Sequence, residues 1–373
     1  MALSDLLAAE LLLAAFAGGA FGAAIGALPS FSLAGLVVVV GEVYAMGVRS
    51  LDGAVPVDIT GGVAFGVVLG PHVAFGGGAA AVAYAARRGY VDTDGSPYAA
   101  KDVTRGLGSR PDVLAVGGAF GVVGYGIATA AGSLAVPVDP VALGVVGSAL
   151  AHRVVLGYSV VGAPVGRLLD GSLFDMSPHA RADAETATGG EIDGDGETAV
   201  SPDGGSAVDD AGPRAVDPWL PYQYRWGQVA ALGAVVGALS AYTAYRTGSA
   251  FLAFGITVSV LFLLCADVAE IPVTHHMALP ASTVVVALAG VSGGTPAPTA
   301  VAGSVSLGTA LVAGAALGVL GGLLGELFQR VLYAHAETHL DPPAASIVVT
   351  SGVVAALALV GVLPTAAWVP LPA

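Results

Sequence analysis

Ten stretches of this 373-residue chain are apolar over a length that suits a membrane-crossing helix, and no other feature limits the fold as strongly. A helix needs about 20 apolar residues to cross roughly 30 Å of hydrocarbon. A transmembrane barrel is excluded, because its strands alternate apolar and polar residues and these runs are apolar on every side. The sequence therefore predicts an all-α polytopic membrane protein with spans at 5–28, 30–48, 59–87, 113–133, 140–163, 226–246, 249–268, 276–292, 305–330 and 343–363.

The composition agrees with a membrane location. The chain is 55% hydrophobic and 11% charged, which leaves too few charges to solvate a globule of this size. Acidic residues outnumber basic residues by 27 to 13. This balance resembles that of proteins from salt-loving archaea, because molar salt shortens the Debye length to about 3 Å and screens an acidic surface. No basic stripe is present, so the lipid bilayer is an expected partner and nucleic acid is not.

The same pattern occurs twice along the chain. The segment LAVGGAFGVVGYGI, which starts at Leu114, matches LVAGAALGVLGGLL, which starts at Leu311, at six of fourteen positions. Each copy is followed by an Asp-Pro pair, VDPVA with Asp139 and LDPPA with Asp341, that opens another apolar run. The order of these features predicts an internal duplication.

The duplication divides the chain into three parts. Residues 1–166 form a first membrane repeat of five spans, and residues 226–373 form a second. Residues 167–225 hold 12 of the 27 acidic side chains among small and polar residues, which is typical of a disordered linker. A unit with five spans re-enters from the opposite face, so we expect two inverted five-helix repeats, as in many secondary transporters.

Basic residues predict the orientation of the spans. If the N-terminus lies outside the cell, the outer loops carry only Arg49 and Arg246. The inner loops then carry ten basic residues, namely Arg87, Arg88, Lys101, Arg105, Arg110, Arg167, Arg181, Arg214, Arg225 and Arg330. Because inner loops are enriched in Lys and Arg, both ends of the chain are expected outside the cell membrane and the linker in the cytoplasm.

Two spans carry signals for an interruption or a re-entrant turn. Gly70 and Pro71 interrupt the third span immediately before His72, and Pro280 follows a histidine pair in the eighth. A break at membrane depth frees backbone groups, which are tolerated only where protein or a water-filled cavity satisfies them. These positions therefore indicate a solute path.

Arg153 is the first candidate for lining that path, with His152 beside it in the predicted fifth span. An arginine at the centre of a span costs about 2.5–3.5 kcal/mol on insertion scales. Either an anionic substrate or a structural ion pair with Glu42 or Glu326 would compensate this cost. Glu326 also has Arg330 four residues later, in the order that favours pairing on one helix.

A second set of candidates joins carboxylates to histidines. Glu42 precedes His72, and Asp267 precedes His276, at corresponding places in the two repeats. A carboxylate and an imidazole that face one cavity can relay protons or ligate a cation. The alternative is that Asp267 ends a helix at the interface and His72 makes a single hydrogen bond.

A metal site is a further hypothesis. His335 and His339 are four residues apart, and Glu337 lies between them; His275 and His276 are expected on the same side of the membrane. The order differs from H-E-x-x-H, so a metalloprotease is not indicated. The competing interpretation is a hydrated loop with Asp341 as the N-cap of the tenth helix.

The resulting expectation is a transporter or channel for a small solute or ion, with a path at the midplane between the repeats. Arg153 favours an anion, whereas the carboxylates and histidines favour a cation or proton coupling. An enzyme is not favoured and no cofactor is predicted. A membrane-embedded metal-dependent enzyme and a noncatalytic scaffold remain the alternatives, and a homo-oligomer is left open.

Overall fold

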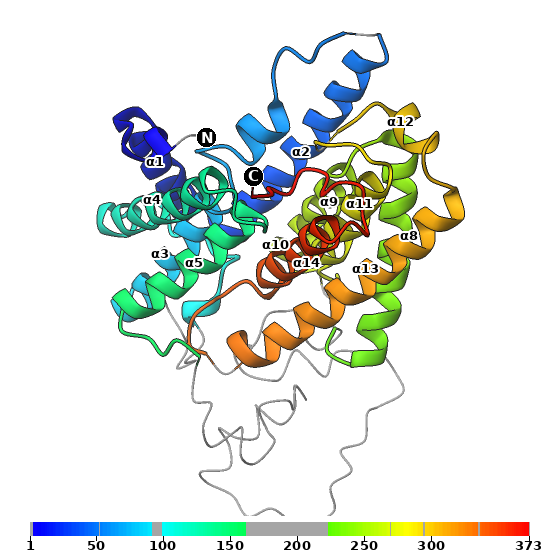
Figure 1. The fold of residues 1–373 in the computed structure, drawn as a ribbon. Helices are drawn as coiled ribbons and strands as arrows, with labels where there is room; N and C mark the ends of the chain where they lie inside the picture. The colour runs from blue at the N-terminus through cyan, green and yellow to red at the C-terminus, as the bar shows by residue number, and fades with distance from the viewer. Residues whose placement is uncertain are drawn as a thin grey trace, which may run out of the picture.

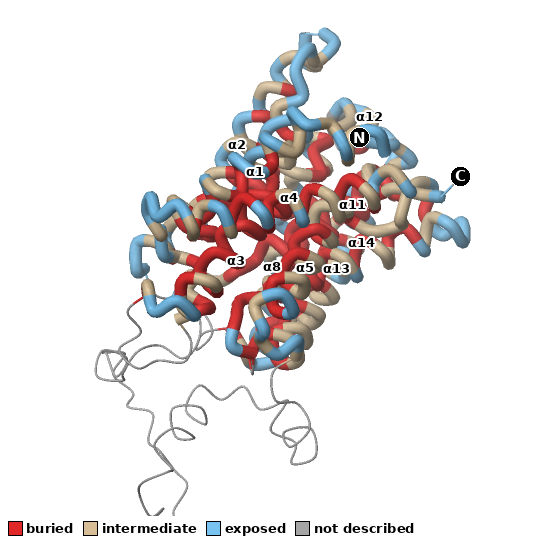
Figure 2. Tube along the Cα trace, turned by 90° about the vertical axis from the view of Figure 1, so that its left-hand side faces the viewer, coloured by how far each residue is buried: buried red, intermediate tan, exposed pale blue. Residues whose placement is uncertain are grey.

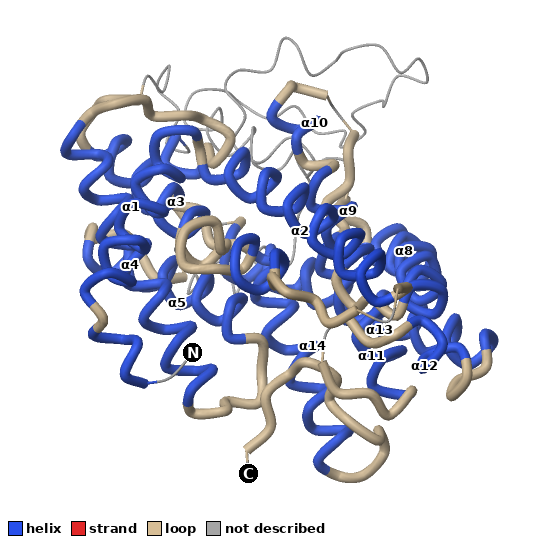
Figure 3. The backbone as a smooth tube through the Cα atoms, turned by 90° about the horizontal axis from the view of Figure 1, so that it is seen from above, coloured by secondary structure: helices blue, strands red, loops and turns tan. Residues whose placement is uncertain are grey.

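The computed structural model describes residues 3–51, 53–91, 99–161, 223–268, 270–293, 295–334 and 336–372. Every regular element in these ranges is helical, and no strand occurs among them (Figure 3). Five helices are long and apolar enough to cross a membrane. They are α2 (Ala27–Arg49), α4 (Pro111–Ser133), α8 (Trp226–Thr247), α13 (Leu307–Phe328) with its continuation η6 (Gln329–Tyr333), and α14 (Pro342–Leu359).

The remaining helices are shorter. A helix of 14 residues, such as α3 or α11, covers about 21 Å and cannot by itself cross about 30 Å of hydrocarbon. The longer members of this set are α1 (Ala9–Ile25), α3 (Ala74–Arg87), α5 (Pro140–Val155), α9 (Leu252–Ser259) and α11 (His275–Leu288). The short turns are η1 (Leu3–Leu7), η2 (Thr60–Ala64), η3 (Ala99–Lys101), α10 (Phe262–Cys265) and α12 (Pro298–Ala302).

The helices form two groups that follow the order of the chain (Figure 1). In the first group α1 packs on α3 and α4, and α4 packs on α5; in the second, α8 packs on α11 and α13, and α13 packs on α14. The groups meet where α2 packs on α9 and α5 packs on α14. Buried residues concentrate in the middle of the bundle (Figure 2). Most of the predicted linker 167–225 lies outside the described residues.

Glycines set the close packing inside each group. A Cβ on Gly19 of α1 would overlap the backbone of Gly117 and Gly121 in α4. A Cβ on Gly237 of α8 would likewise overlap the backbone of Gly314 in α13. Such close approach of backbones stabilises helix pairs where no hydrophobic driving force acts between them. The sequence pair that starts at Leu114 and Leu311 therefore makes the same kind of crossing in both groups.

The contact between α2 and α9 is also reciprocal. Gly35 of α2 lies against Val258 of α9, while Gly255 of α9 lies against Val38 of α2. Each glycine accepts the valine of the other helix, as expected where the same surface patch is used by two similar units.

Two of the short helices begin deep inside the bundle. The carbonyl of His72, which precedes α3, lies against Gly124 near the middle of α4. The carbonyl of His276, at the start of α11, lies against Gly321 near the middle of α13. The first start corresponds to the interruption expected near Gly70 and Pro71, where residues 65–73 form turns between η2 and α3. The interruption expected at Pro280 is wrong, because α11 continues through Pro280 to Leu288.

The predicted fifth span is too long at its C-terminal end. Helix α5 ends at Val155 instead of continuing to residue 163, because Gly157 adopts a left-handed conformation with φ of 73°. The predicted seventh span is also divided, into α9 and α10. Both changes shorten helices that contact the centre of the molecule.

Replacing Gly124 by alanine tests the importance of these close approaches. A Cβ at this position would overlap the His72 carbonyl, whereas a Cβ on Gly126 in the same helix would meet open space. We expect Gly124→Ala to lower the free energy of unfolding in detergent by about 1–3 kcal/mol. Gly126→Ala should be neutral or stabilising, because alanine favours helix by about 1 kcal/mol over glycine. Equal stability of the two variants would contradict this packing.

Candidate functional site

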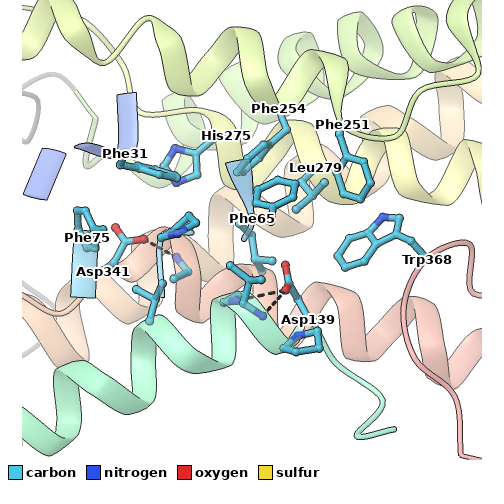
Figure 4. Close-up of a pocket in the computed structure, with 17 residues that line it drawn as sticks. Phe31, Phe65, Phe75, Asp139, Phe251, Phe254, His275, Leu279, Asp341 and Trp368 are labelled. Atoms are coloured by element: carbon cyan, nitrogen blue, oxygen red, sulfur yellow. Dashed lines mark hydrogen bonds between the residues drawn. The ribbon is translucent and has the colours of Figure 1, made fainter. Parts of the chain in front are cut away.

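A cavity of about 160 Å³ lies between the two groups of helices (Figure 4). Its wall is mainly apolar and contains six aromatic rings, two aspartates and one histidine. The principal lining residues are Phe31, Phe65, Phe75, Phe251, Phe254, Trp368, Asp139, Asp341, His275, Leu279, Ala142, Ala344, Val145 and Ile347. We call this space the central cavity.

Four helices contribute residues of their first turn to the central cavity. They are α3 through Phe75, α5 through Val141 and Ala142, α11 through His275, and α14 through Ala344. The N-terminus of each helix carries about half a positive charge from the aligned peptide dipoles. The cavity therefore lies where four partial positive charges converge.

Two carboxylates offset that charge, because four half charges amount to about +2 and the carboxylates to −2. One oxygen of Asp139, the N-cap of α5, accepts hydrogen bonds from the amides of Val141 and Ala142 at 2.8 and 3.2 Å. Asp341, the N-cap of α14, accepts one from the Ala344 amide at 2.9 Å, which confirms the predicted cap. The repeated Asp-Pro motif thus places one carboxylate from each group in the same cavity.

Among the polar side chains of this wall, His275 has the most unusual surroundings. Its side chain is 2% exposed, and neither ring nitrogen has a hydrogen-bond partner among the described residues. The ring packs edge-on against Phe31 and Phe254, with centroids 5.1 and 5.8 Å away. Buried polar groups without partners are rare, so this ring needs a reason for its position.

One end of the central cavity is closed by Phe65 and Phe251, whose ring centroids are 5.4 Å apart. Both rings also line a second cavity of about 360 Å³, which contains Glu42, Arg49 and Asp58 and which we call the Glu42 cavity. The phenylalanine pair therefore separates an apolar space from a polar one.

Phe31 and Phe75, which line the central cavity, begin a row of ring contacts that leads away from it. Phe31 contacts Phe75 at 5.8 Å between centroids, Phe75 contacts His339 at 5.4 Å, and His339 contacts Tyr333 at 5.2 Å. Lys101 of the first group ends this row, with its Nζ 4.6 Å from the Tyr333 ring and 2.9 Å from the Tyr333 carbonyl oxygen.

Arg153 does not lie at the middle of a span, because α5 ends two residues after it. Its guanidinium donates to the hydroxyl and carbonyl oxygens of Thr338 at 3.0 and 2.8 Å and to the Val160 carbonyl at 2.6 Å. The expected ion pair with Glu42 or Glu326 is therefore wrong. Glu326 instead pairs with Arg330 at 2.6 Å, as their spacing predicted. His152 is within hydrogen-bonding distance of the Thr338 hydroxyl, 3.2 Å away.

Glu42 is 1% exposed and accepts hydrogen bonds from three hydroxyl groups. Thr60 of the first group donates at 2.7 Å, and Ser249 and Thr295 of the second group donate at 2.6 and 2.7 Å. Glu42 therefore joins the two groups of helices. The proposed counterpart Asp267 differs, because it is exposed in the turn after α10.

His72 and His276 take equivalent places before α3 and at the start of α11, where their carbonyls contact Gly124 and Gly321. Both ring nitrogens of His72 and Nδ1 of His276 are buried without a hydrogen-bond partner among the described residues. Neither ring lines the central cavity. His72 does not bond to Glu42, whose partners are hydroxyl groups.

The hypothetical metal ligands do not form a described cluster. His335 lies outside the described residues, and Glu337 is exposed. Within the described part of the chain, no group of three or more His, Cys, Asp or Glu side chains is arranged to hold a metal ion. The rings of His275 and His276 contact each other, with centroids 5.8 Å apart, whereas His339 packs against Phe75.

The aromatic wall was not predicted from the sequence. Phe31, Phe65, Phe75, Phe251 and Phe254 are scattered through separate apolar runs, where aromatic residues are also ordinary core residues. The signal that could have located the cavity is the Asp-Pro motif, because it follows both of the matching segments that start at Leu114 and Leu311 and opens a helix each time.

The comparisons with known proteins give one match. A family model described as "Family of unknown function (DUF7973)" matches residues 1–372. No curated protein and no solved structure matches the chain.

Replacing Arg153 by methionine tests whether this side chain holds the structure together. Methionine preserves the apolar stem but removes the three hydrogen bonds to Thr338 and Val160. We expect the free energy of unfolding in detergent to fall by about 2–5 kcal/mol. The control Arg88→Met removes an exposed arginine and should change it by less than about 0.5 kcal/mol. Similar small effects for both variants would contradict the structural role of Arg153.

Proposed function

Because the chain belongs to the DUF7973 family, whose function is unknown, we propose a function from the geometry of the central cavity. The protein is an integral membrane transporter or channel for a small solute or ion, which passes between two inverted five-helix repeats. The observation that carries this proposal is a cavity between the two groups of helices, with aromatic side chains in its wall from both groups.

The inverted repeat is supported by corresponding contacts. The pairs α1–α4, α3–α4 and α4–α5 of the first group have counterparts in α8–α13, α11–α13 and α13–α14. Two of the contacts between the groups, α2 with α9 and α5 with α14, join helices that hold the same position in the order of each repeat. In this arrangement each half crosses the membrane five times, and the interrupted segments before α3 and α11 contribute the helix starts at the centre.

Two sets of polar contacts join the halves on opposite sides of the central cavity. The Glu42 clamp consists of Glu42 with Ser249 and Thr295. The Lys101–Arg153 clamp consists of these two cations bonded to segment 333–338. The Lys101–Arg153 clamp lies near Leu28 of α2, because the Leu28 amide donates a hydrogen bond to the carbonyl of Val103, two residues after Lys101. Leu28 and Glu42 are separated by about 21 Å along α2. Rocking that breaks one clamp while the other remains would open the cavity to one side at a time.

The scaffold alternative predicts a sealed bundle, and a central cavity counts against it. The enzyme alternative rests on the hypothetical metal ligands, of which His335 lies outside the described residues. The test of transport is flux in proteoliposomes at high salt, for which the acidic composition is suited. We expect saturable uptake of at least one member of a panel of ions, amines, carboxylates and neutral solutes. Absence of uptake across the panel would contradict the proposal.

Filling the central cavity should block that flux. Ala142 is 4% exposed and lines the cavity, so a phenylalanine there has space to enter without removing a polar group. We expect Ala142→Phe to reduce uptake at least about tenfold while the protein remains folded. The control Val155→Phe changes a residue that is 71% exposed on the same helix and should retain uptake. Normal uptake by Ala142→Phe would exclude the central cavity as the path.

We also propose that both ends of the chain lie outside the cell and that the linker lies in the cytoplasm. Cysteine labelling of intact cells tests this orientation in a Cys265→Ser background, since Cys265 is the only cysteine. A membrane-impermeant maleimide should label Ser50→Cys, between α2 and η2, but not Ser206→Cys in the linker. The reverse pattern would contradict the orientation.

A further inference from the structure

We propose that the central cavity binds a small organic ammonium ion. This inference deepens the proposed transport function and rests on it for the passage of the ion, but binding itself can be measured separately. The argument uses four properties of the cavity: its charge, its aromatic wall, the free nitrogens of His275 and its size.

The formal charges in the wall are negative. Asp139 and Asp341 are both lining residues, and the lining includes no lysine or arginine. One oxygen of Asp139 is used by two backbone amides, and no hydrogen bond from the described residues reaches the other. Figure 4 shows the two aspartates toward opposite ends of the cavity. A cation between them would have a carboxylate on either side.

The aromatic wall selects an organic cation over an inorganic one. Sodium or potassium loses its water only where several oxygen atoms replace it, whereas most of this wall is phenylalanine and tryptophan. Alkylated ammonium ions are instead stabilised by the faces of aromatic rings. The indole nitrogen of Trp368 already donates to Thr283 at 2.9 Å, so its ring faces are the part available for binding.

His275 supplies an acceptor that the protein does not use. Both of its ring nitrogens are buried without a hydrogen-bond partner among the described residues, and the side chain lines the cavity. A neutral imidazole accepts a hydrogen bond through one nitrogen. An ammonium ion that carries an N–H group would satisfy this acceptor, whereas a quaternary ion would not.

The size of the cavity limits the ligand. Its volume of about 160 Å³ is close to that of an engineered protein cavity of about 150 Å³ that binds benzene. The space therefore fits an ion of up to roughly six heavy atoms, a limit that methylammonium, dimethylammonium and tetramethylammonium all meet.

Fluorescence of Trp368 measures this binding directly in detergent. The substitutions Trp219→Phe and Trp226→Phe leave Trp368, which lines the cavity, as the only tryptophan. Titration with methylammonium or tetramethylammonium chloride should give a saturable change in emission. Sodium and potassium chloride at the same ionic strength should give none. Absence of a saturable change with both ammonium ions, or an equal response to the inorganic salts, would overturn the inference.

Substitutions in the same single-tryptophan protein locate the site. Asparagine also caps helices, so Asp139→Asn and Asp341→Asn remove charge while the cap is kept. Each should weaken binding of both ammonium ions at least about tenfold. The control Asp112→Asn removes a carboxylate from the first turn of α4, outside the cavity, and should bind as the parent does. Parent-like affinity in both cavity variants would overturn the inference.

His275→Phe separates the two kinds of ammonium ion. It keeps an aromatic ring but removes the acceptor, so methylammonium should bind about tenfold more weakly while tetramethylammonium binds within about twofold of the parent. An equal loss for the two ions would contradict the role of His275 as the acceptor.

Flux measurements distinguish the failure of this inference from the failure of the proposed function. Uptake of a different solute by a protein that binds neither ammonium ion supports transport and overturns the ammonium site. Binding of ammonium ions without flux of any solute supports the site and contradicts transport.

Discussion

Helix starts in the middle of a bundle of apolar helices are the constraint on which the rest of this structure depends. The first amides of a helix have no partner within the helix, and hydrocarbon offers none. Asp139 and Asp341 satisfy such amides at α5 and α14 by capping. Because a buried carboxylate is costly where no positive charge is near, the caps and the helix dipoles stabilise one another. The central cavity lies where these carboxylate caps and helix N-termini meet.

Close backbone packing brings those helix starts near one another. Gly124 and Gly321 let the carbonyls of His72 and His276 approach the middle of α4 and α13, which no larger residue would permit. The short helices α3 and α11 therefore begin near the centre of the bundle instead of at its surface. Aromatic residues near these helix starts fill most of the space between the two groups of helices. The space that they leave unfilled is the central cavity.

The sequence predicted the parts of this fold that depend on hydrophobic length and local motif. These parts are the apolar helices, the interruption near Pro71, the cap at Asp341 and the pairing of Glu326 with Arg330. Arg153 was misplaced because the end of α5 depends on the left-handed turn at Gly157, and a single glycine in a glycine-rich span is a weak stop signal. The aromatic wall was missed because its members converge only through tertiary packing, which hydropathy does not encode.

Different side chains connect the two groups of helices on the two sides of the cavity. On one side, a single pair of rings separates the cavity from the polar space around Glu42. On the other, a row of rings leads to Lys101, and Arg153 bonds to the same segment of the second half. Because each connection includes residues from both halves, a relative rotation of the halves would alter both connections together.

The central claim is that the cavity opens to each side of the membrane in turn, and cysteine accessibility at Ala344 tests it most directly. Ala344→Cys in a Cys265→Ser background places a thiol in the cavity wall at a position contributed by α14. In proteoliposomes of known orientation, a small impermeant methanethiosulfonate reagent should modify this cysteine when applied from either side. Modification from neither side, or from one side only, would contradict the account.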